Sequence, residues 1–125
     1  MPIHVAWCEQ YEAVICVDLI LPWDWDDFRV ALQQQQDLIK ELGQVKAFLI
    51  DVRAAGDFPP SGFIRNSRYA LNLLPLVPMI FLSETQMMPM LMTPVISIMR
   101  TKRAYHFVHS EEKVAEIITD ILANG

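Results

Sequence analysis

The segment from Asp51 to Arg68, which reads DVRAAGDFPPSGFIRNSR, holds the densest set of side chains that could bind a charged ligand. It follows an apolar run that we interpret as a buried strand, and open α/β sheets bind ligands at the carboxyl ends of their strands. Ser61 and Gly62 open a predicted helix, whose free N–H groups favour an anion. The charged residues of the segment are Asp51, Arg53, Asp57, Arg65 and Arg68. The set predicts a site for a phosphate or for a partner's carboxylate. The alternative is a serine that only caps the helix, beside solvated arginines.

A methionine-rich segment, ETQMMPMLMTPVISIMR from Glu84 to Arg100, is the second candidate. Methionine is adaptable and is common on surfaces that repack against partners. Pro89 and Pro94 would break or kink a regular helix here. The segment is interpreted as an irregular core helix, and its functional alternative is an apolar groove or a segment exchanged between protomers. The methionines of the expected groove are Met87, Met88, Met90 and Met92.

The stretch PWDWDDF places three aspartates among aromatic residues and could be a site for a cation or a sugar. Calcium loops spread their ligands over more residues and carry a glycine at the sharp turn, which is missing here. The stretch fits a helix start better. Asp24 would be the N-cap and Asp27 the third helical residue of a capping box, while Trp23 would pack on Phe28 as a hydrophobic staple.

Catalytic and metal-binding motifs are not evident. The chain has no G-x-S-x-G, no glycine-rich phosphate loop and no H-E-x-x-H. Ser61, His109 and Asp51 can be combined into a triad only on paper. His106 and His109 would point to opposite faces of a strand, so they do not form a metal pair. We therefore expect a protein that is not an enzyme and that has no cofactor and no metal.

Length and composition restrict the class of protein. The 125 residues, of which 53% are hydrophobic and 20% charged, predict one domain, residues 1–125. The net charge of −5 makes nucleic acid a poor partner, because polyanion binding depends on lysine and arginine. No secretory signal and no apolar run long enough to span a membrane is visible. Cys8 and Cys16 lie on neighbouring predicted strands and could face each other, but we expect reduced, buried thiols in a cytoplasmic protein.

Hydrophobic periodicity predicts the elements that position these residues. The predicted strands are Ile3 to Cys8, Ala13 to Leu21, Val45 to Val52, Met79 to Leu82 and Ala104 to Val108. The predicted helices are Asp24 to Leu42, Ser61 to Leu74, the methionine-rich segment, and a last helix capped by Ser110. The first two strands form an antiparallel hairpin, and the order β-β-α-β-α-β-α-β-α requires a mixed, largely parallel α/β sheet with four helices packed on it. The basic segment Arg100 to Arg103 is interpreted as a solvated helix end.

Three parts of this chain resemble a STAS-like domain, the fold of bacterial anti-sigma-factor antagonists. They are PWDWDDF at the first helix, FLIDVR as the central strand, and YHFVHSEEKVAEII as the last strand and helix. The resemblance covers most of the chain and is closest to small stand-alone bacterial members of that fold. It implies a regulatory domain that binds another protein.

The regulatory family carries a phosphorylated serine or threonine in an Asp-Ser-Ser-Gly-like turn before the second helix. Here that turn reads Pro59, Pro60, Ser61, Gly62, so the phosphoacceptor position falls on Pro60. The resemblance therefore implies docking through the second helix and its leading loop without the phosphorylation switch. We expect another protein as the partner, and a homodimer is left open. A carrier of a small apolar, lipid-like or acidic ligand is the alternative function.

Overall fold

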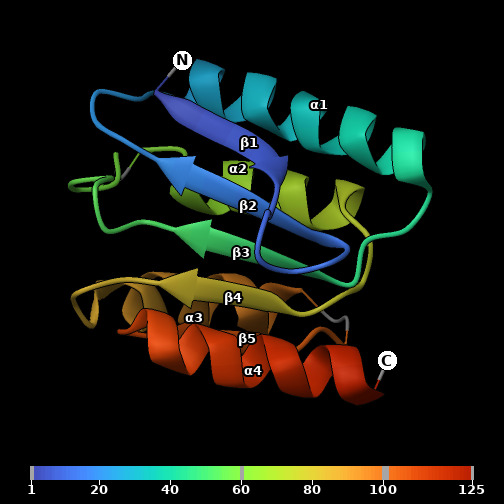
Figure 1. Cartoon of the computed structure of the whole chain (residues 1–125). Helices are drawn as coiled ribbons and strands as arrows, with labels where there is room; N and C mark the ends of the chain where they lie inside the picture. The colour runs from blue at the N-terminus through green and yellow to red at the C-terminus, as the bar shows by residue number, and fades with distance from the viewer. Residues whose placement is uncertain (1, 60, 100–101, 125) are drawn as a thin grey trace.

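The computed structural model describes residues 2–59, 61–99 and 102–124, which form five strands and four helices (Figure 1). The strands are β1 (Ile3–Trp7), β2 (Val14–Leu19), β3 (Ala47–Asp51), β4 (Met79–Leu82) and β5 (Tyr105–Val108). The helices are α1 (Trp25–Leu42), α2 (Phe63–Leu73), α3 (Met87–Ile98) and α4 (Glu111–Asn124). This order confirms the α/β architecture predicted from the sequence.

The five strands form one sheet in the order β1-β2-β3-β4-β5. β1 and β2 are antiparallel, whereas β2, β3, β4 and β5 run parallel to one another. A short link suffices for the hairpin, while each parallel pair needs a crossover helix, and α1, α2 and α3 supply the three crossovers. The carboxyl ends of the four parallel strands therefore share one edge of the sheet.

The two faces of the sheet are covered unequally. α1, α2 and α3 lie on one face and α4 lies on the other, in front of the lower strands in Figure 1. The larger core packs the three crossover helices on residues such as Val17, Phe48 and Phe81. The smaller core packs α4 on residues such as Ile80 and Leu82. On the α4 side of β1, His4 and Ala6 are exposed, so part of that face has no helix over it.

The start of α1 confirms the capping prediction for PWDWDDF. The Asp24 side chain accepts a hydrogen bond from the Asp27 backbone N–H at 2.8 Å, and Asp27 returns the bond to the Asp24 N–H at 3.1 Å. The predicted staple is different, because Trp25 is the tryptophan whose ring lies edge-on to Phe28, at 5.3 Å between centroids. Trp23 is buried and donates its indole N–H to the Ala55 carbonyl instead.

The methionine-rich segment forms a continuous α-helix with Pro94 inside it, and it is more regular than the sequence predicts. Pro89 lies in the first turn, where a missing backbone N–H costs little. Ser110 caps α4 through the Lys113 backbone N–H at 3.2 Å, as predicted.

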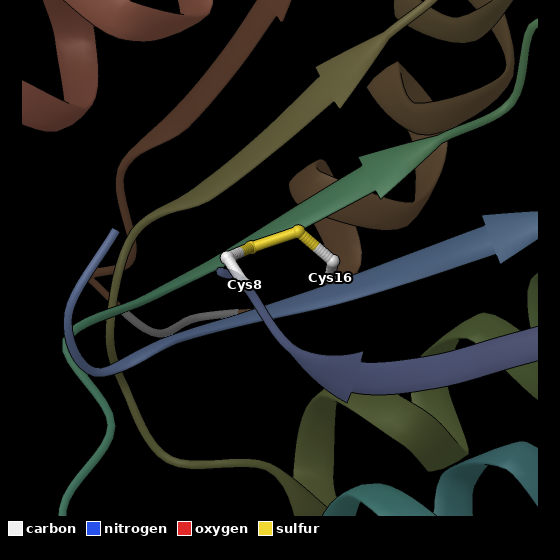
Figure 2. Close-up of a disulfide and its surroundings, with 2 residues drawn as sticks. All are labelled: Cys8 and Cys16. Carbon is white, nitrogen blue, oxygen red and sulfur yellow. A yellow bond between two sulfur atoms is a disulfide. The ribbon is translucent and has the colours of Figure 1, made fainter. Parts of the chain in front are cut away.

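The prediction of reduced cysteines is wrong, because Cys8 and Cys16 form a disulfide. Figure 2 shows the two side chains meeting across the first hairpin, and their Cα atoms are 5.4 Å apart. In the sheet register Cys16 lies opposite Ala6, and the Cys8 N–H bonds to the Val14 carbonyl just beyond the end of β1. Strand pairing therefore brings the two thiols together, and both remain half-buried.

The prediction that Arg103 belongs to a solvated helix end is wrong. Its side chain is buried, and its two terminal nitrogens donate to four backbone carbonyls after and within the last turn of α2. The acceptors are the carbonyls of Leu71, Leu74, Pro75 and Val77. Arg100 of the same basic segment lies outside the described residues. Arg103 thus binds the Leu71 and Leu74 carbonyls at the end of α2 together with two carbonyls of the loop that follows.

Candidate functional site

The carboxyl edge of the parallel strands carries a cleft with several charged side chains, which we call the edge cleft. These charged side chains are at or just beyond the ends of three neighbouring strands: Asp18, Asp51, Arg53 and Glu84. Asp51 and Arg53 were predicted to lie here from the sequence. The position agrees with the general location of ligand sites in open α/β sheets.

Asp51 and Arg53 are bound to each other. The Arg53 Nη2 donates to Asp51 Oδ2 at 2.8 Å and its Nε donates to Oδ1 at 3.0 Å, and the Arg53 backbone N–H also bonds Oδ1. Burial alone would raise the pKa of Asp51, but the hydrogen bonds and charge of Arg53 outweigh it and lower that pKa. A second carboxylate, Glu111 at the start of α4, lies 3.9 Å from the same guanidinium. Arg53 is therefore neutralised from within the chain and is a poor anchor for an external anion.

Sequence reasoning missed two charged residues of the cleft, the exposed Glu84 and the less exposed Asp18. Asp18 stands directly beside Asp51 in the parallel register of β2 and β3, with His4 opposite it on β1. Burial raises the pKa of the Asp18 carboxyl, and the neighbouring negative charge of Asp51 raises it further. His4 and Arg53 act in the opposite direction. An aspartate inside the apolar run VICVDLIL was the only signal in the sequence, and its meaning depends on the strand register.

The start of α2 differs from the sequence prediction in its cap, while the anion site expected at Ser61 and Gly62 stays a prediction. α2 begins at Phe63, its N-cap is Gly62 with a φ of 90°, and no side chain caps it, so the prediction of a Ser61 cap is wrong. The Ser61 carbonyl accepts the indole N–H of Trp25 at 2.9 Å. A Cβ atom on Gly62 would lie 3.0 Å from the Asn66 amide and 3.4 Å from the Trp25 indole nitrogen. The side chains of Asn66 and Trp25 therefore leave little room for a larger residue at position 62.

Arg65 and Arg68 lie on the outer side of α2, away from the edge cleft, and both are exposed. Ile64 directly precedes Arg65 and Tyr69 directly follows Arg68, and their side chains are exposed at 43% and 45%. Arg29 of α1 lies over the Tyr69 ring, with 4.8 Å from its guanidinium carbon to the ring centroid. We call the surface formed by Arg29, Ile64, Arg65, Arg68 and Tyr69 the arginine face. The structure thus separates the predicted site residues into the edge cleft and the arginine face, and Asp57 is exposed in the loop between β3 and α2.

The four methionines of the predicted groove are divided by α3. Met88 and Met92 are buried and line a cavity between the helices and the sheet, whereas Met87 and Met90 are exposed at 38% and 74%. The helical period explains the division, because residues four apart share one face and the next residues turn away from it. One continuous groove of all four side chains is therefore not formed.

Comparisons of the chain with protein-family models, with curated proteins and with solved structures find no match. Within residues 2–59, 61–99 and 102–124, no helix is both long and apolar enough to cross a membrane. The same residues contain no group of three or more histidine, cysteine or acidic side chains placed to hold a metal ion.

Proposed function

We propose that this chain is a STAS-like domain that acts without catalysis, by docking an acidic segment of another protein on the arginine face. The STAS-like assignment is supported by the element order and by a sheet in which only the first strand is antiparallel. It is also supported by three crossover helices on one face (Figure 1). The docking function is proposed from the exposed residues of the arginine face.

The observation that carries the proposal is the concentration of exposed arginines on the outer side of α1 and α2. Arg29, Arg65 and Arg68 take part in none of the ion pairs formed among the described residues. The chain as a whole carries a net charge of −5, so this surface differs in sign from the average of the molecule. A local positive surface of this kind steers an acidic partner and fixes its orientation.

The apolar residues of the arginine face would supply contact area. Tyrosine and arginine are enriched among the residues that dominate binding energies, and Tyr69 is held in place by Arg29 above its ring. Guanidinium groups bind carboxylates through two parallel hydrogen bonds, which lysines cannot reproduce. The surface therefore suits a segment that presents glutamate or aspartate beside an apolar side chain.

The family's phosphorylation switch is not part of the proposal. The phosphoacceptor position of the resemblance is Pro60, which lies outside the described residues, and Ser61 is exposed beside it. We expect that incubation with ATP and cell extract leaves Ser61 unlabelled, as measured by mass spectrometry. Stoichiometric phosphate on Ser61 would restore the switch and move the docking site to the start of α2.

The location of the protein is also a proposal. A disulfide such as Cys8–Cys16 is rare in cytosolic proteins and persists in oxidising compartments. It weighs against the cytoplasmic location predicted from the sequence. Acid-quenched cells treated with a thiol-alkylating reagent would report the state of the two cysteines. Full alkylation without reductant would restore the cytoplasmic interpretation.

The docking proposal is tested by charge reversal on a purified partner. A partner first captured on the wild-type chain is identified, purified and titrated by calorimetry against Arg65→Glu and Arg68→Glu. Each reversal should weaken binding more than tenfold, which corresponds to about 1.4 kcal/mol. Lys113→Glu is the matched control, because Lys113 is an exposed cation on α4, which covers the other face of the sheet.

Two outcomes would change the proposal. An affinity that survives both reversals would remove the arginine face as the docking surface. If the chain itself dimerises, and sedimentation shows that Arg65→Glu but not Lys113→Glu dissociates the dimer, the occupant is a second copy of this chain.

A further inference from the structure

The three crossover helices and the sheet line an apolar cavity between them, which we call the helix-layer cavity. Its volume is about 80 Å³. α1, α2 and α3 all contribute to its wall, together with strand residues from β1 to β4. The cavity lies within the larger core, and its wall is therefore mainly apolar.

Small side chains explain why this part of the core is not filled. Ala31 of α1 and Ala70 of α2 both line the cavity, and both are buried among larger neighbours. A cavity in a packed core destabilises a protein in proportion to its volume, because its lining atoms lose their contacts. A molecule that fills the space restores those contacts, so the folded state gains stability on binding.

The dimensions and chemistry of the wall restrict the ligand. An engineered apolar cavity of about 150 Å³ stays dry and binds benzene or xenon, so a cavity of 80 Å³ suits a molecule smaller than benzene. Met79, Met88 and Met92 line the wall, and methionine side chains adapt their shape to an occupant. Two polar side chains, Gln35 and Ser67, also line the wall. They can bind one hydrogen-bonding group of the ligand.

We propose that the helix-layer cavity is a binding site for a small apolar molecule, smaller than benzene and with at most one polar group. The site is separate from the arginine face, because the residues that line it are on the inner sides of the helices. The two proposals can therefore be tested separately, and failure of one does not remove the other.

The test uses xenon as the probe and the methionine methyl groups as reporters. The full chain is labelled with ¹³C at the methionine methyls and titrated with xenon under pressure. The signals of Met79, Met88 and Met92 should shift and saturate, because their side chains line the cavity. The signals of Met87 and Met90, which are exposed, should move only in linear proportion to xenon pressure.

A filled cavity provides the matched comparison. Ala70→Leu adds three carbon atoms to the wall and should abolish the saturable shift, whereas Ala123→Leu, on the exposed side of α4, should leave it unchanged. Ala31→Leu fills the same space from α1 and replaces Ala70→Leu in this comparison if that variant does not fold.

Three results would overturn the proposal. The first is a wild-type titration in which buried and exposed methionine signals respond alike. The second is a saturable shift that persists in a folded cavity-filled variant. The third is benzene saturating the same three signals at lower concentration than xenon, which would show that the ligand class is larger than proposed.

Discussion

Asp18 and Asp51 are neighbours of the same type with opposite behaviour. The pKa of Asp18 is raised, first by burial and then by the charge of Asp51, whereas the bonds from Arg53 keep the pKa of Asp51 low despite its burial. Folding therefore disfavours ionisation of Asp18 and favours ionisation of its neighbour Asp51. Two aspartates on adjacent strands differ because only one of them has an arginine two residues further along the chain.

We expect Asp18→Asn to stabilise the protein at neutral pH. A carboxyl whose pKa is raised on folding contributes stability below its ordinary pKa of 3.8 and loses it as the pH rises through the folded value. The amide removes this loss, so the gain should disappear in urea titrations performed below the ordinary pKa. Asp57→Asn, a change at an exposed loop aspartate, is the control. A destabilised Asp18→Asn variant at neutral pH would contradict the unfavourable role assigned to this carboxylate.

Asp51 should make the free energy of unfolding change with pH in the direction opposite to Asp18. Because its pKa is lowered on folding, the stability that it contributes is present above the ordinary pKa and is lost as the pH falls through the folded value. Arg53→Met should remove most of this dependence, since the guanidinium is the cause of the low pKa. The measurement is the free energy of unfolding in urea as a function of pH. An unchanged acid-side slope in Arg53→Met would contradict the ion pair as its origin.

At the scale of single elements, the sequence predicted nearly everything that depends on neighbours along the chain. The capping box of Asp24 and Asp27 and the cap at Ser110 involve residues three apart, and both are present. The strands and helices are found within a few residues of their predicted bounds. The start of α2 was missed because Ser61 is a good capping residue in general, while the actual N-cap is a glycine with positive φ.

The site was predicted less well, because it depends on contacts between distant residues. Asp51 and Arg53 follow one strand and were found, but Asp18 joins them only through the register of β2 and β3. Arg103 reads as a surface cation in a basic run, and its acceptors are about 30 residues earlier. The sequence placed Cys8 and Cys16 on facing strands, but a spacing of eight residues does not decide whether they are oxidised, since this depends on the exact strand register and on the compartment.

Asp24→Ala should lower the free energy of unfolding by roughly 0.5–2 kcal/mol, as is usual when an N-cap side chain is lost. The Asp27 N–H at the start of α1 would then have no side-chain acceptor. Asp26→Ala is the control, because Asp26 is an exposed residue of the same first turn. Binding on the arginine face should be unchanged in the folded variant. Weaker binding without lower stability would instead return PWDWDDF to the list of binding sites.

Arg103→Lys should destabilise the protein although it conserves the charge. One ammonium group cannot reach the four carbonyls that the planar guanidinium contacts around the end of α2. A hydrogen bond to a charged group contributes about 1.5–3 kcal/mol to stability. We expect the free energy of unfolding, measured by chemical denaturation, to fall by an amount of that order. Lys102→Ala, at an exposed neighbour, should have little effect. A loss equal to that of Lys102→Ala would show that the carbonyls find other partners.

At the scale of the whole molecule, the disulfide adds a covalent cross-link between side chains to the hairpin of β1 and β2. Its two cysteines are eight residues apart, and closing a loop of this length in the unfolded chain corresponds to roughly 2–3 kcal/mol of stability. Reduction with dithiothreitol should therefore lower the free energy of unfolding by about this amount. The double variant Cys8→Ser, Cys16→Ser should be equally less stable and insensitive to the reductant. Equal stability of the oxidised and reduced wild-type protein would contradict this role.

The position of α2 connects the two proposals thermodynamically. Its inner side lines the helix-layer cavity, and its outer side carries most of the arginine face. If filling the cavity changes the position or the mobility of this helix, then the affinity for a docked partner must change by some factor. Linkage requires that the docked partner change the affinity of the cavity ligand by the same factor. A single helix would then make the protein a reciprocal sensor, in which either binding event can be read through the other.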